Sequence, residues 1–394
     1  MALQQLLTAE WLLPGPAGRQ IRDGAVLVQD DKIIAAGPRS DVEPLASPEV
    51  KRRDYPDATI LPGLINCHVH LVFDAGLDPE RAAADATHAD MEERAQRLLR
   101  SGVTTIRDLG DRDGLAISLR ERLNAAAAPG PRIVASGPPI TVPNGHCWFL
   151  GGEASGEAAL RARVRRNAEL GADLIKVMAS GGQITPNSPS MRDSQFSRGE
   201  LVAIVDEATK FRLPVAAHAH GTQAIAAAID AGATTIEHCT WMRTGGDGYD
   251  LRDDIAARMA ERGIFACVAW PSDWQGFMNR LGPARADHVT KRFAWMVRHG
   301  ITMIPGTDAG TPNSHFDNYA GALQLYVHLG YDRARVIEMA TTTSARALGL
   351  DRTTGRLSAG CAADVLVVNG DPLADLAALS RVCLVLAQGR AAEI

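Results

Sequence analysis

The sequence contains no CxxC cysteine pair, no run rich in lysine and arginine, and no apolar run long enough to cross a membrane. Its six scattered cysteines argue against a disulfide framework and favour reduced, mostly buried thiols. The net charge of 41 − 46 = −5 is too small to indicate a nucleic-acid partner. Residues 1–15 lack the basic start, long apolar core and cleavage site of a signal peptide, so we expect a cytoplasmic protein with neither nucleic acid nor membrane as a partner.

One phrase recurs through the middle of the chain, in which a helical stretch ends at a glycine and an apolar run of strand character follows. Its instances are SGVTTIRD, LGADLIKV, AGATTIEH, RGIFACVA and HGITMIPG. Glycine ends a helix readily because it tolerates the left-handed conformation. Strands that alternate with helices indicate a parallel sheet, and eight of them favour a closed (β/α)8 TIM barrel. The predicted strands are 60–65, 103–107, 132–135, 174–178, 215–217, 234–237, 264–268 and 303–305.

The two flanks of the chain read differently, as short alternating strands separated by turn signals. Each flank is too small for a core of its own. We therefore predict that residues 1–58 and 350–394 pair into one small β-sandwich, and that residues 59–349 form the barrel.

Residues of metal-ligand type stand at the ends of the predicted barrel strands. A parallel barrel gathers these ends on one face, so residues far apart in sequence are expected to meet in one pocket. In the HxH pair His68-Val69-His70, both imidazoles face the same side of an extended chain. The ligand-type residues are His68, His70, Lys176, His218, His238 and Asp308.

Lys176 is an unusual member of this set, because lysine is a poor metal ligand. Its strand has apolar residues on both sides, and a buried lysine has a lowered pKa. A neutral amine can react with carbon dioxide, and the resulting carbamate is an oxygen ligand able to bridge two cations. The alternative is a buried stem with a solvated head group.

Asp308 precedes a turn after the last predicted strand, where an aspartate is commonly a helix N-cap. In a closed barrel this strand lies beside the first, which also brings Asp308 to His68 and His70. Together the residues predict two divalent ions that share a hydroxide, with Asp308 as the catalytic proton shuttle.

These motifs resemble those of the amidohydrolase superfamily over essentially the whole chain. The matching segments are LPGLINCHVH, LIKVMASGG, VAAHAHG, TIEHCT, GTDAG and AADVLVVNGDPLADL. The resemblance implies a binuclear site, usually with zinc, in which His68, His70 and Asp308 hold one metal, His218 and His238 the other, and carboxylated Lys176 bridges both. It leaves His220 as a residue that either faces the substrate or supports the metal ligands from behind.

The resemblance extends to Xaa-Pro and Xaa-Arg dipeptidases and ochratoxin amidases, which cleave amides. It implies hydrolysis of an N-acyl amino acid or dipeptide-like small molecule. His146, in an NGH segment where those enzymes have GGH, is expected to hydrogen-bond the substrate carbonyl or its oxyanion. Further candidates for substrate binding are Arg107, Gln183, His315 and Tyr319, although Arg107 has an alternative as a structural partner of Asp108.

Several alternatives stay open at this level. A deaminase, a cyclic-amide hydrolase of imidazolonepropionase type, and a lactone or carbamate hydrolase share the same ligand pattern. Gly221 stands where such deaminases have a glutamate, and the ring opener needs no lysine ligand. An inactive scaffold is the alternative from another class, and the intact ligand set argues against it. We expect a homo-oligomer, although the sequence does not specify its order.

Overall fold

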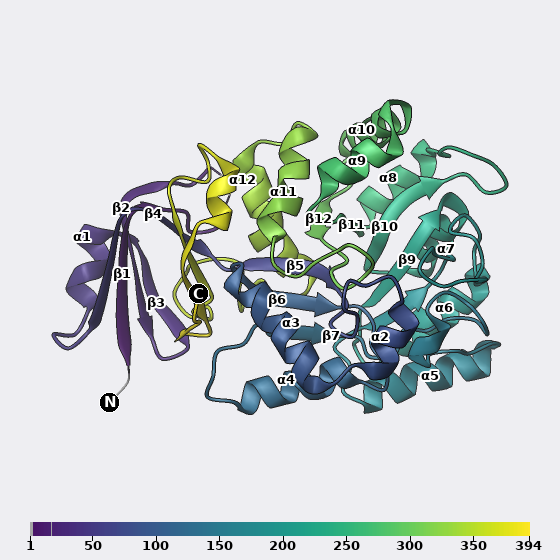
Figure 1. The fold of residues 1–394 in the computed structure, drawn as a ribbon, viewed down its shortest axis with the longest axis horizontal. Helices are drawn as coiled ribbons and strands as arrows, with labels where there is room; N and C mark the ends of the chain where they lie inside the picture. The colour runs from purple at the N-terminus through teal and green to yellow at the C-terminus, as the bar shows by residue number, and fades with distance from the viewer. Residues whose placement is uncertain (1–2, 17) are drawn as a thin grey trace.

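The computed structural model describes residues 3–16 and 18–394 (Figure 1). Eight parallel strands follow one another in chain order and form the larger part of the molecule. They divide into a three-stranded sheet, β5-β6-β7, and a five-stranded sheet, β12-β11-β10-β9-β8. The strands are β5 (Leu64–Val69), β6 (Val103–Asp108), β7 (Arg132–Ala135), β8 (Ile175–Met178), β9 (Val215–Gly221), β10 (Thr235–Met242), β11 (Phe265–Ala269) and β12 (Met303–Gly306).

Isolated bridges join these two sheets at both seams. A parallel bridge between Ile140 and Val177 links the chain after β7 to β8, and another between Val69 and Ala309 links β5 to the chain after β12. At the second seam, the backbone N–H of Asp308 donates to the carbonyl of His68 at 2.9 Å. The strands therefore run in a ring, as the alternation of strands and helices predicts, and each seam rests on a bridge rather than a full ladder.

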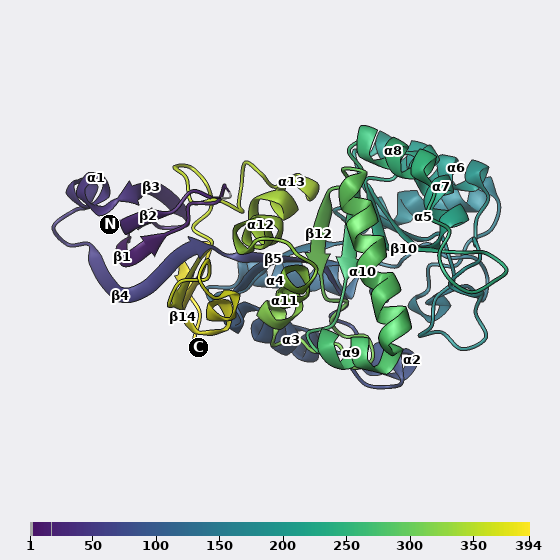
Figure 2. The ribbon, with the colours of Figure 1, turned by 90° about the horizontal axis from the view of Figure 1, so that it is seen from above.

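Helices alternate with the strands and cover the outside of the ring (Figure 2). Local sequence explains several of their ends: Thr87 and Ser197 form capping boxes with Asp90 and Glu200, and Gly232 ends α7 with a φ of 92°. The helices of the barrel part are α2 (Pro79–Asp85), α3 (His88–Arg100), α4 (Leu115–Ala125), α5 (Glu157–Glu169), α6 (Arg198–Lys210), α7 (Thr222–Ala231), α8 (Asp253–Glu261), α9 (Trp274–Leu281), α10 (Pro283–Arg298), α11 (Tyr319–His328), α12 (Arg333–Glu338) and α13 (Ser344–Ala347).

Strands from both chain ends join in one seven-stranded sheet beside the barrel, in the order β15-β14-β13-β4-β1-β2-β3 (Figure 1). Side chains from both halves of this sheet, such as Leu7 and Val26 from one and Val365 and Leu384 from the other, share one buried cluster. The sheet thus folds over its own core, as a sandwich does. Its elements are β1 (Gln4–Leu12), β2 (Ile21–Gln29), β3 (Lys32–Pro38), β4 (Lys51–Pro62), β13 (Val365–Asn369), β14 (Val382–Ala387) and β15 (Arg390–Ala391), with the short helix α1 (Arg39–Val42) after β3.

The predicted first barrel strand, 60–65, is wrong in one respect, because it is two strands in the structure. Residues 60–62 end β4 and pair with β13, whereas the barrel strand β5 begins at Leu64. Gly63 separates them where the backbone passes so close to Thr104 that a Cβ would lie 2.1 Å from its hydroxyl. The domain limits at 58/59 and 349/350 stay a prediction, and β4 runs across the first of them.

Across the residues that the structure describes, no helix combines the length and apolar character needed to cross a membrane.

Candidate metal centre and active site

The carboxyl ends of the barrel strands open into a cavity of about 710 Å³. Every ligand-type residue expected from the sequence lines it, which brings together positions as distant in the chain as His68 and Asp308. The cavity residues of this type are His68, His70, His146, Lys176, His218, His220, His238 and Asp308.

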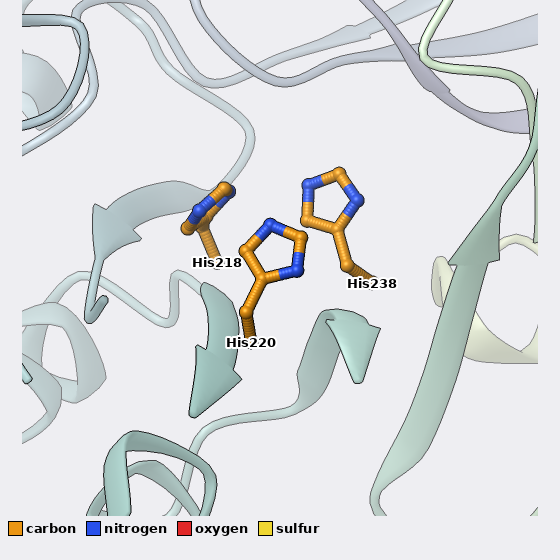
Figure 3. Close-up of side chains that lie close together, drawn as sticks. All are labelled: His218, His220 and His238. Atoms are coloured by element: carbon orange, nitrogen blue, oxygen red, sulfur yellow. The ribbon is translucent and has the colours of Figure 1, made fainter. Parts of the chain in front are cut away.

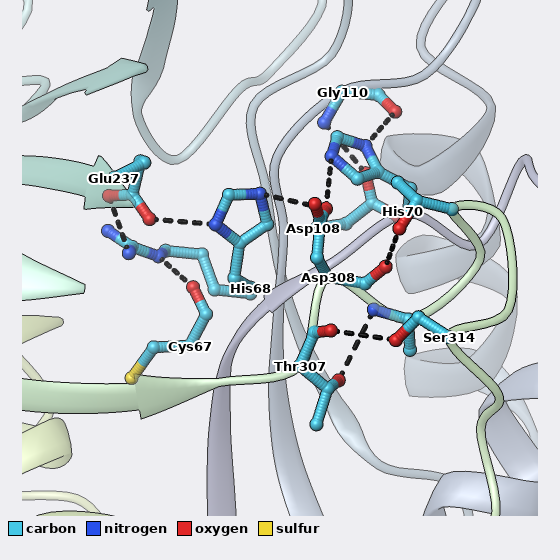
Figure 4. Close-up of polar contacts among 12 residues, drawn as sticks. Cys67, His68, His70, Asp108, Gly110, Glu237, Thr307, Asp308 and Ser314 are labelled. Carbon is cyan, nitrogen blue, oxygen red and sulfur yellow. Dashed lines mark hydrogen bonds and ion pairs between the residues drawn. The ribbon is translucent and has the colours of Figure 1, made fainter. Parts of the chain in front are cut away.

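One cluster of ligand atoms forms where β5 meets the end of β12 (Figure 4). Oδ1 of Asp308 lies 3.3 Å from Nε2 of His68 and 3.4 Å from Nε2 of His70. That buried carboxylate oxygen has no hydrogen-bond partner among the described residues. One ligand atom from each of His68, His238 and Asp308 lies within 4.8 Å of the others, an arrangement that suits a divalent cation, and His70 contacts the same carboxylate oxygen.

A second cluster is formed by His218 and His220 from β9 and His238 from β10 (Figure 3). Their ring centroids are 4.5–4.7 Å apart, and one nitrogen from each lies within 4.8 Å of the others. The ring of His68 is 5.0 Å from that of His238, so the two clusters are adjacent. Because His220 belongs to this cluster, it is placed among the ligand-type side chains as well as facing the cavity.

Polar contacts from outside the clusters orient the imidazoles. Nδ1 of His68 lies 3.0 Å from Oε2 of Glu237, and Nδ1 of His70 lies 3.0 Å from the carbonyl of Gly110. Nε2 of His218 lies 3.0 Å from the carbonyl of Gly181. A ring nitrogen that donates outward leaves the other nitrogen of that ring as a lone-pair ligand, which fixes the tautomer that a metal requires.

Lys176 lies on β8, lines the same cavity and is almost completely buried. Burial lowers the pKa of Lys176, which favours its neutral form, against the opposing effect of the nearby carboxylates of Glu237 and Asp308. Burial likewise lowers the pKa of His70 to about 4 and of His220 to about 3. For Asp308, burial acts to raise the pKa, but the interactions with His68, His70 and Lys176 outweigh it, and the pKa falls below its ordinary range.

Backbone strain is concentrated at the same strand ends. Asp308 has a φ of 56° and His238 a φ of 63°, in the left-handed region that these residue types adopt infrequently. Such conformations cost about 1–3 kcal/mol and persist where the surrounding structure imposes them. Here they direct both side chains into the cavity.

His146 enters the cavity from the loop after β7, with its ring 4.7 Å from that of His218. The hydroxyl of Thr185 accepts a hydrogen bond from the backbone N–H of Cys147 at 2.8 Å and lies 3.0 Å from Nδ1 of His146. When this hydroxyl donates its hydrogen to Nδ1, the ring proton of His146 lies on Nε2. Burial lowers the pKa of His146 to about 3, so the ring is neutral.

Two further residues expected to bind substrate, Gln183 and His315, differ in whether they line the cavity. Gln183, like His146 and His220, lines the cavity. His315 does not: it is exposed, and its neighbour Ser314 faces the cavity instead.

The expectations for Arg107 and Tyr319 are corrected, because both side chains are buried away from the cavity. Arg107 donates to the carbonyl of Cys67 at 2.7 Å and to Oε1 of Glu237 at 2.9 Å, and it lines a smaller cavity at the opposite ends of the strands. Its structural partner is Glu237, not Asp108. The hydroxyl of Tyr319 donates to the carbonyl of Ile65 at 2.7 Å, which fixes it against the outside of the ring.

Two residues of the site were not foreseen from the sequence. Glu237 stands immediately before His238, where strand alternation turns it to the barrel interior. Arg292 lines the cavity from α10, on the same helical face as the buried Val289 and Met296. An arginine on an apolar helix face is the signal that was available for it.

A parallel ring with ligand-type side chains at its carboxyl ends has the architecture of a barrel hydrolase with candidate metal sites. The model of the amidohydrolase family matches residues 59–392. The chain belongs to this family, and it is a hydrolase that acts on carbon–nitrogen bonds.

Three proteins illustrate the similarity. The ochratoxinase of Aspergillus niger is 28% identical over 417 residues, covering 94% of this chain and 82% of that protein. Its crystal structure aligns with a TM-score of 0.84 and 25% identity, over 99% of this chain and 95% of the other. An imidazolonepropionase of Ralstonia nicotianae is 28% identical over 385 residues, covering 91% and 89%. A Xaa-Pro dipeptidase crystallised with methionine in its active site aligns with a TM-score of 0.83 and 25% identity, over 99% of this chain and 100% of the other.

Proposed function

We propose that this amidohydrolase cleaves the amide bond of an N-acyl amino acid or dipeptide-like small molecule, with two divalent ions, zinc by preference, as cofactors. The observation that carries the proposal is the meeting of two histidine clusters and Asp308 in one cavity that the buried Lys176 also lines. The similarity to an ochratoxinase and a Xaa-Pro dipeptidase supports an amide substrate over the other bonds that this architecture hydrolyses. A cytoplasmic location and a homo-oligomeric assembly stay predictions.

The donors fit this metal pair. His68, His70 and Asp308 would hold one ion, and His218 and His238 the other. In support, Oδ1 of Asp308 is unpartnered among the described residues, and one ring nitrogen of His68, His70 and His218 contacts a group outside the clusters. Lys176, carboxylated by carbon dioxide, would bridge them, and its lowered pKa supplies the neutral amine that this reaction needs. When bound, such a pair lowers the pKa of a water molecule to near 7 and polarises a carbonyl group.

Asp308 is the proton carrier in this proposal. Its carboxylate is ionised, since the neighbouring His68 and His70 hold its pKa below the ordinary range. The ionised form is the one that can accept a proton from the attacking water and pass it to the leaving nitrogen. Its side chain is 24% exposed, which leaves it reachable from the cavity.

His146 binds the substrate oxygen in this proposal. The Thr185 hydroxyl occupies Nδ1, so the Nε2–H of a neutral ring is free to donate to the scissile carbonyl, more strongly as that oxygen gains negative charge. Gln183 and His220 lie on the same cavity wall and contribute polar contacts to the substrate.

Hydrolysis of a cyclic amide is the second candidate, because an imidazolonepropionase is among the similar proteins. The buried Lys176 in the same cavity argues for the binuclear alternative, since a single-metal ring opener has no use for a lysine ligand.

The test is the metal content of protein purified without chelator, compared between the wild type and Lys176→Ala. We expect about two divalent ions per chain in the wild type, fewer in the variant, and release of an amino acid from N-acyl amino acids or dipeptides. About one ion per chain, unchanged by the substitution, would overturn the binuclear proposal and direct the search to cyclic amides.

A further inference from the structure

Arg292 is a buried cation in the wall of the active-site cavity. It lies on α10, and only 3% of the residue is exposed. Its Nη1 donates to the carbonyl of Thr240 at 3.2 Å. Its guanidinium carbon lies 5.1 Å from the ring centre of Tyr249 and 5.3 Å from that of Phe293.

Within the described part of the chain, Arg292 has no carboxylate partner. Its Nε is buried without a hydrogen-bond acceptor, and the neighbours that influence its charge are Tyr249 and Cys239. The other deeply buried arginine, Arg107, has the carboxylate of Glu237 at 2.9 Å. An unpaired buried charge is destabilising, and contact with aromatic rings offsets only part of that cost. Proteins that retain such a group commonly use it to bind an anion.

Arg292 is linked to the second histidine cluster through Thr240. The hydroxyl of Thr240, whose carbonyl accepts from Arg292, lies 2.8 Å from Nδ1 of His220 in the second histidine cluster. Thr240 itself stands two residues after the proposed ligand His238 on β10. The guanidinium is therefore one residue away from the histidine cluster.

We propose that Arg292 binds a carboxylate of the substrate, close to the scissile amide, and thereby selects acids over their neutral analogues. This inference rests on the proposed amide hydrolysis and narrows its substrate class. A planar guanidinium matches a carboxylate with two parallel hydrogen bonds, and the free N–H groups of Arg292 supply them.

The rest of the cavity wall suits an apolar group on the same substrate. Trp270, Phe277, Ile184, Met191 and Leu77 all line the cavity. The wall thus combines one buried cation with a largely hydrophobic surface, so the expected substrate carries a carboxylate on one side of the amide and an apolar group on the other.

The experiment measures kcat/KM for an N-acyl amino acid and for its α-carboxamide, which differ only in charge at the carboxyl carbon. We expect kcat/KM of the wild type to be about 30-fold or more higher for the acid than for the carboxamide. Arg292→Met should lose this preference, because removing the guanidinium from a buried pair with the substrate carboxylate is costly. Arg292→Lys keeps the charge without the planar fork and is expected to keep part of the preference.

Arg280→Met is the matched control. Arg280 lines the same cavity, but it is exposed and paired with Asp273 at 3.3 Å, so this variant should keep the acid preference. Equal use of acid and carboxamide by the wild type, or an acid preference that survives in folded Arg292→Met, would overturn the role of Arg292 and leave amide hydrolysis standing.

Failure of the proposed function is separable from failure of this inference. If no amide is hydrolysed, calorimetric titration with phenylacetate and phenylacetamide tests the anion site directly. Tighter binding of the acid to the wild type, lost in Arg292→Met and retained in Arg280→Met, would support the site. An acid preference that persists in Arg292→Met would place the carboxylate on the metals instead and overturn the inference.

Discussion

The buried carboxylate of Glu237 contacts the imidazole of His68, with Oε2 of Glu237 3.0 Å from Nδ1 of His68. Its other oxygen accepts a hydrogen bond from Arg107 at 2.9 Å. Burial acts to raise the pKa of Glu237, but the Arg107 cation and His68 outweigh it, and the pKa falls below its ordinary range. An ionised Glu237 holds the proton of His68 on Nδ1 and leaves Nε2 toward Asp308. A proposed metal ligand is thus oriented from β10, a different strand.

Replacing Glu237 by glutamine is therefore expected to weaken metal binding by about 10- to 100-fold, the usual effect of removing a group that orients a ligand. Titration of chelator-treated protein with zinc measures this directly. Glu207→Gln is the control, because Glu207 is a buried, arginine-paired carboxylate on α6 that does not line the cavity. Equal zinc affinity in both variants would contradict the role of Glu237.

Replacing Thr185 by valine removes the hydroxyl that faces Nδ1 of His146. The ring proton is then no longer held on Nε2. We expect kcat to fall about 10- to 100-fold, less than the roughly 100- to 1000-fold cost of removing a hydrogen-bond donor to a developing charge, because His146 itself remains. Thr185→Ser keeps the hydroxyl and should restore most of the rate. Steady-state kinetics decide, and an active valine variant would show that His146 does not depend on this contact.

Gly182→Ala tests the position of the His146 ring from the other side. A Cβ at residue 182 would lie 2.2 Å from the ring, so the imidazole must move. We expect kcat to fall at least about tenfold, since small displacements of a catalytic group are costly, while the metal content stays as in the wild type.

Gly199→Ala is the matched control for that substitution. A Cβ there meets no atom within 4 Å, and the residue lies in the first turn of α6. Unchanged kcat in Gly182→Ala would show that the ring is not fixed where catalysis needs it.

Glu207 gives a prediction for stability at low pH. The hydrogen bond from Lys210 lowers the pKa of Glu207 to about 2, with Arg165 contributing in the same direction. A lowered carboxyl pKa stabilises the fold above the unfolded-state value of about 4.3, and this contribution is lost as the pH falls toward 2. The Tm difference between wild type and Glu207→Gln should be present at pH 7 and disappear progressively below about pH 4. A difference independent of pH would show that the charge of Glu207 is not what stabilises it.

Local sequence signals predicted most of the ring and the ligand-type residues of its cavity. The positions of His68, His218 and His238 were visible because an apolar run stops at each of these polar residues, and parallel strands bring such positions together. Lys176 was visible as the one charged residue inside an apolar strand. The break at Gly63 was not visible, since Leu61 and Leu64 are both apolar and belong to different sheets only through their partners, Leu366 on β13 and Val103 on β6.

The sequence by itself determined the order of the strands, the identity of the ligand-type side chains and the strand ends that carry them, because these depend on periodicity along the chain. The tertiary structure alone decided the direction of the two buried arginines. Arg107, beside the strand-end Asp108, points to the opposite side and pairs with Glu237, which is 130 residues away. Arg292, on a helix without a motif, enters the cavity because α10 packs over it. Pairing and cavity access depend on which distant segments meet, and no local pattern contains that information.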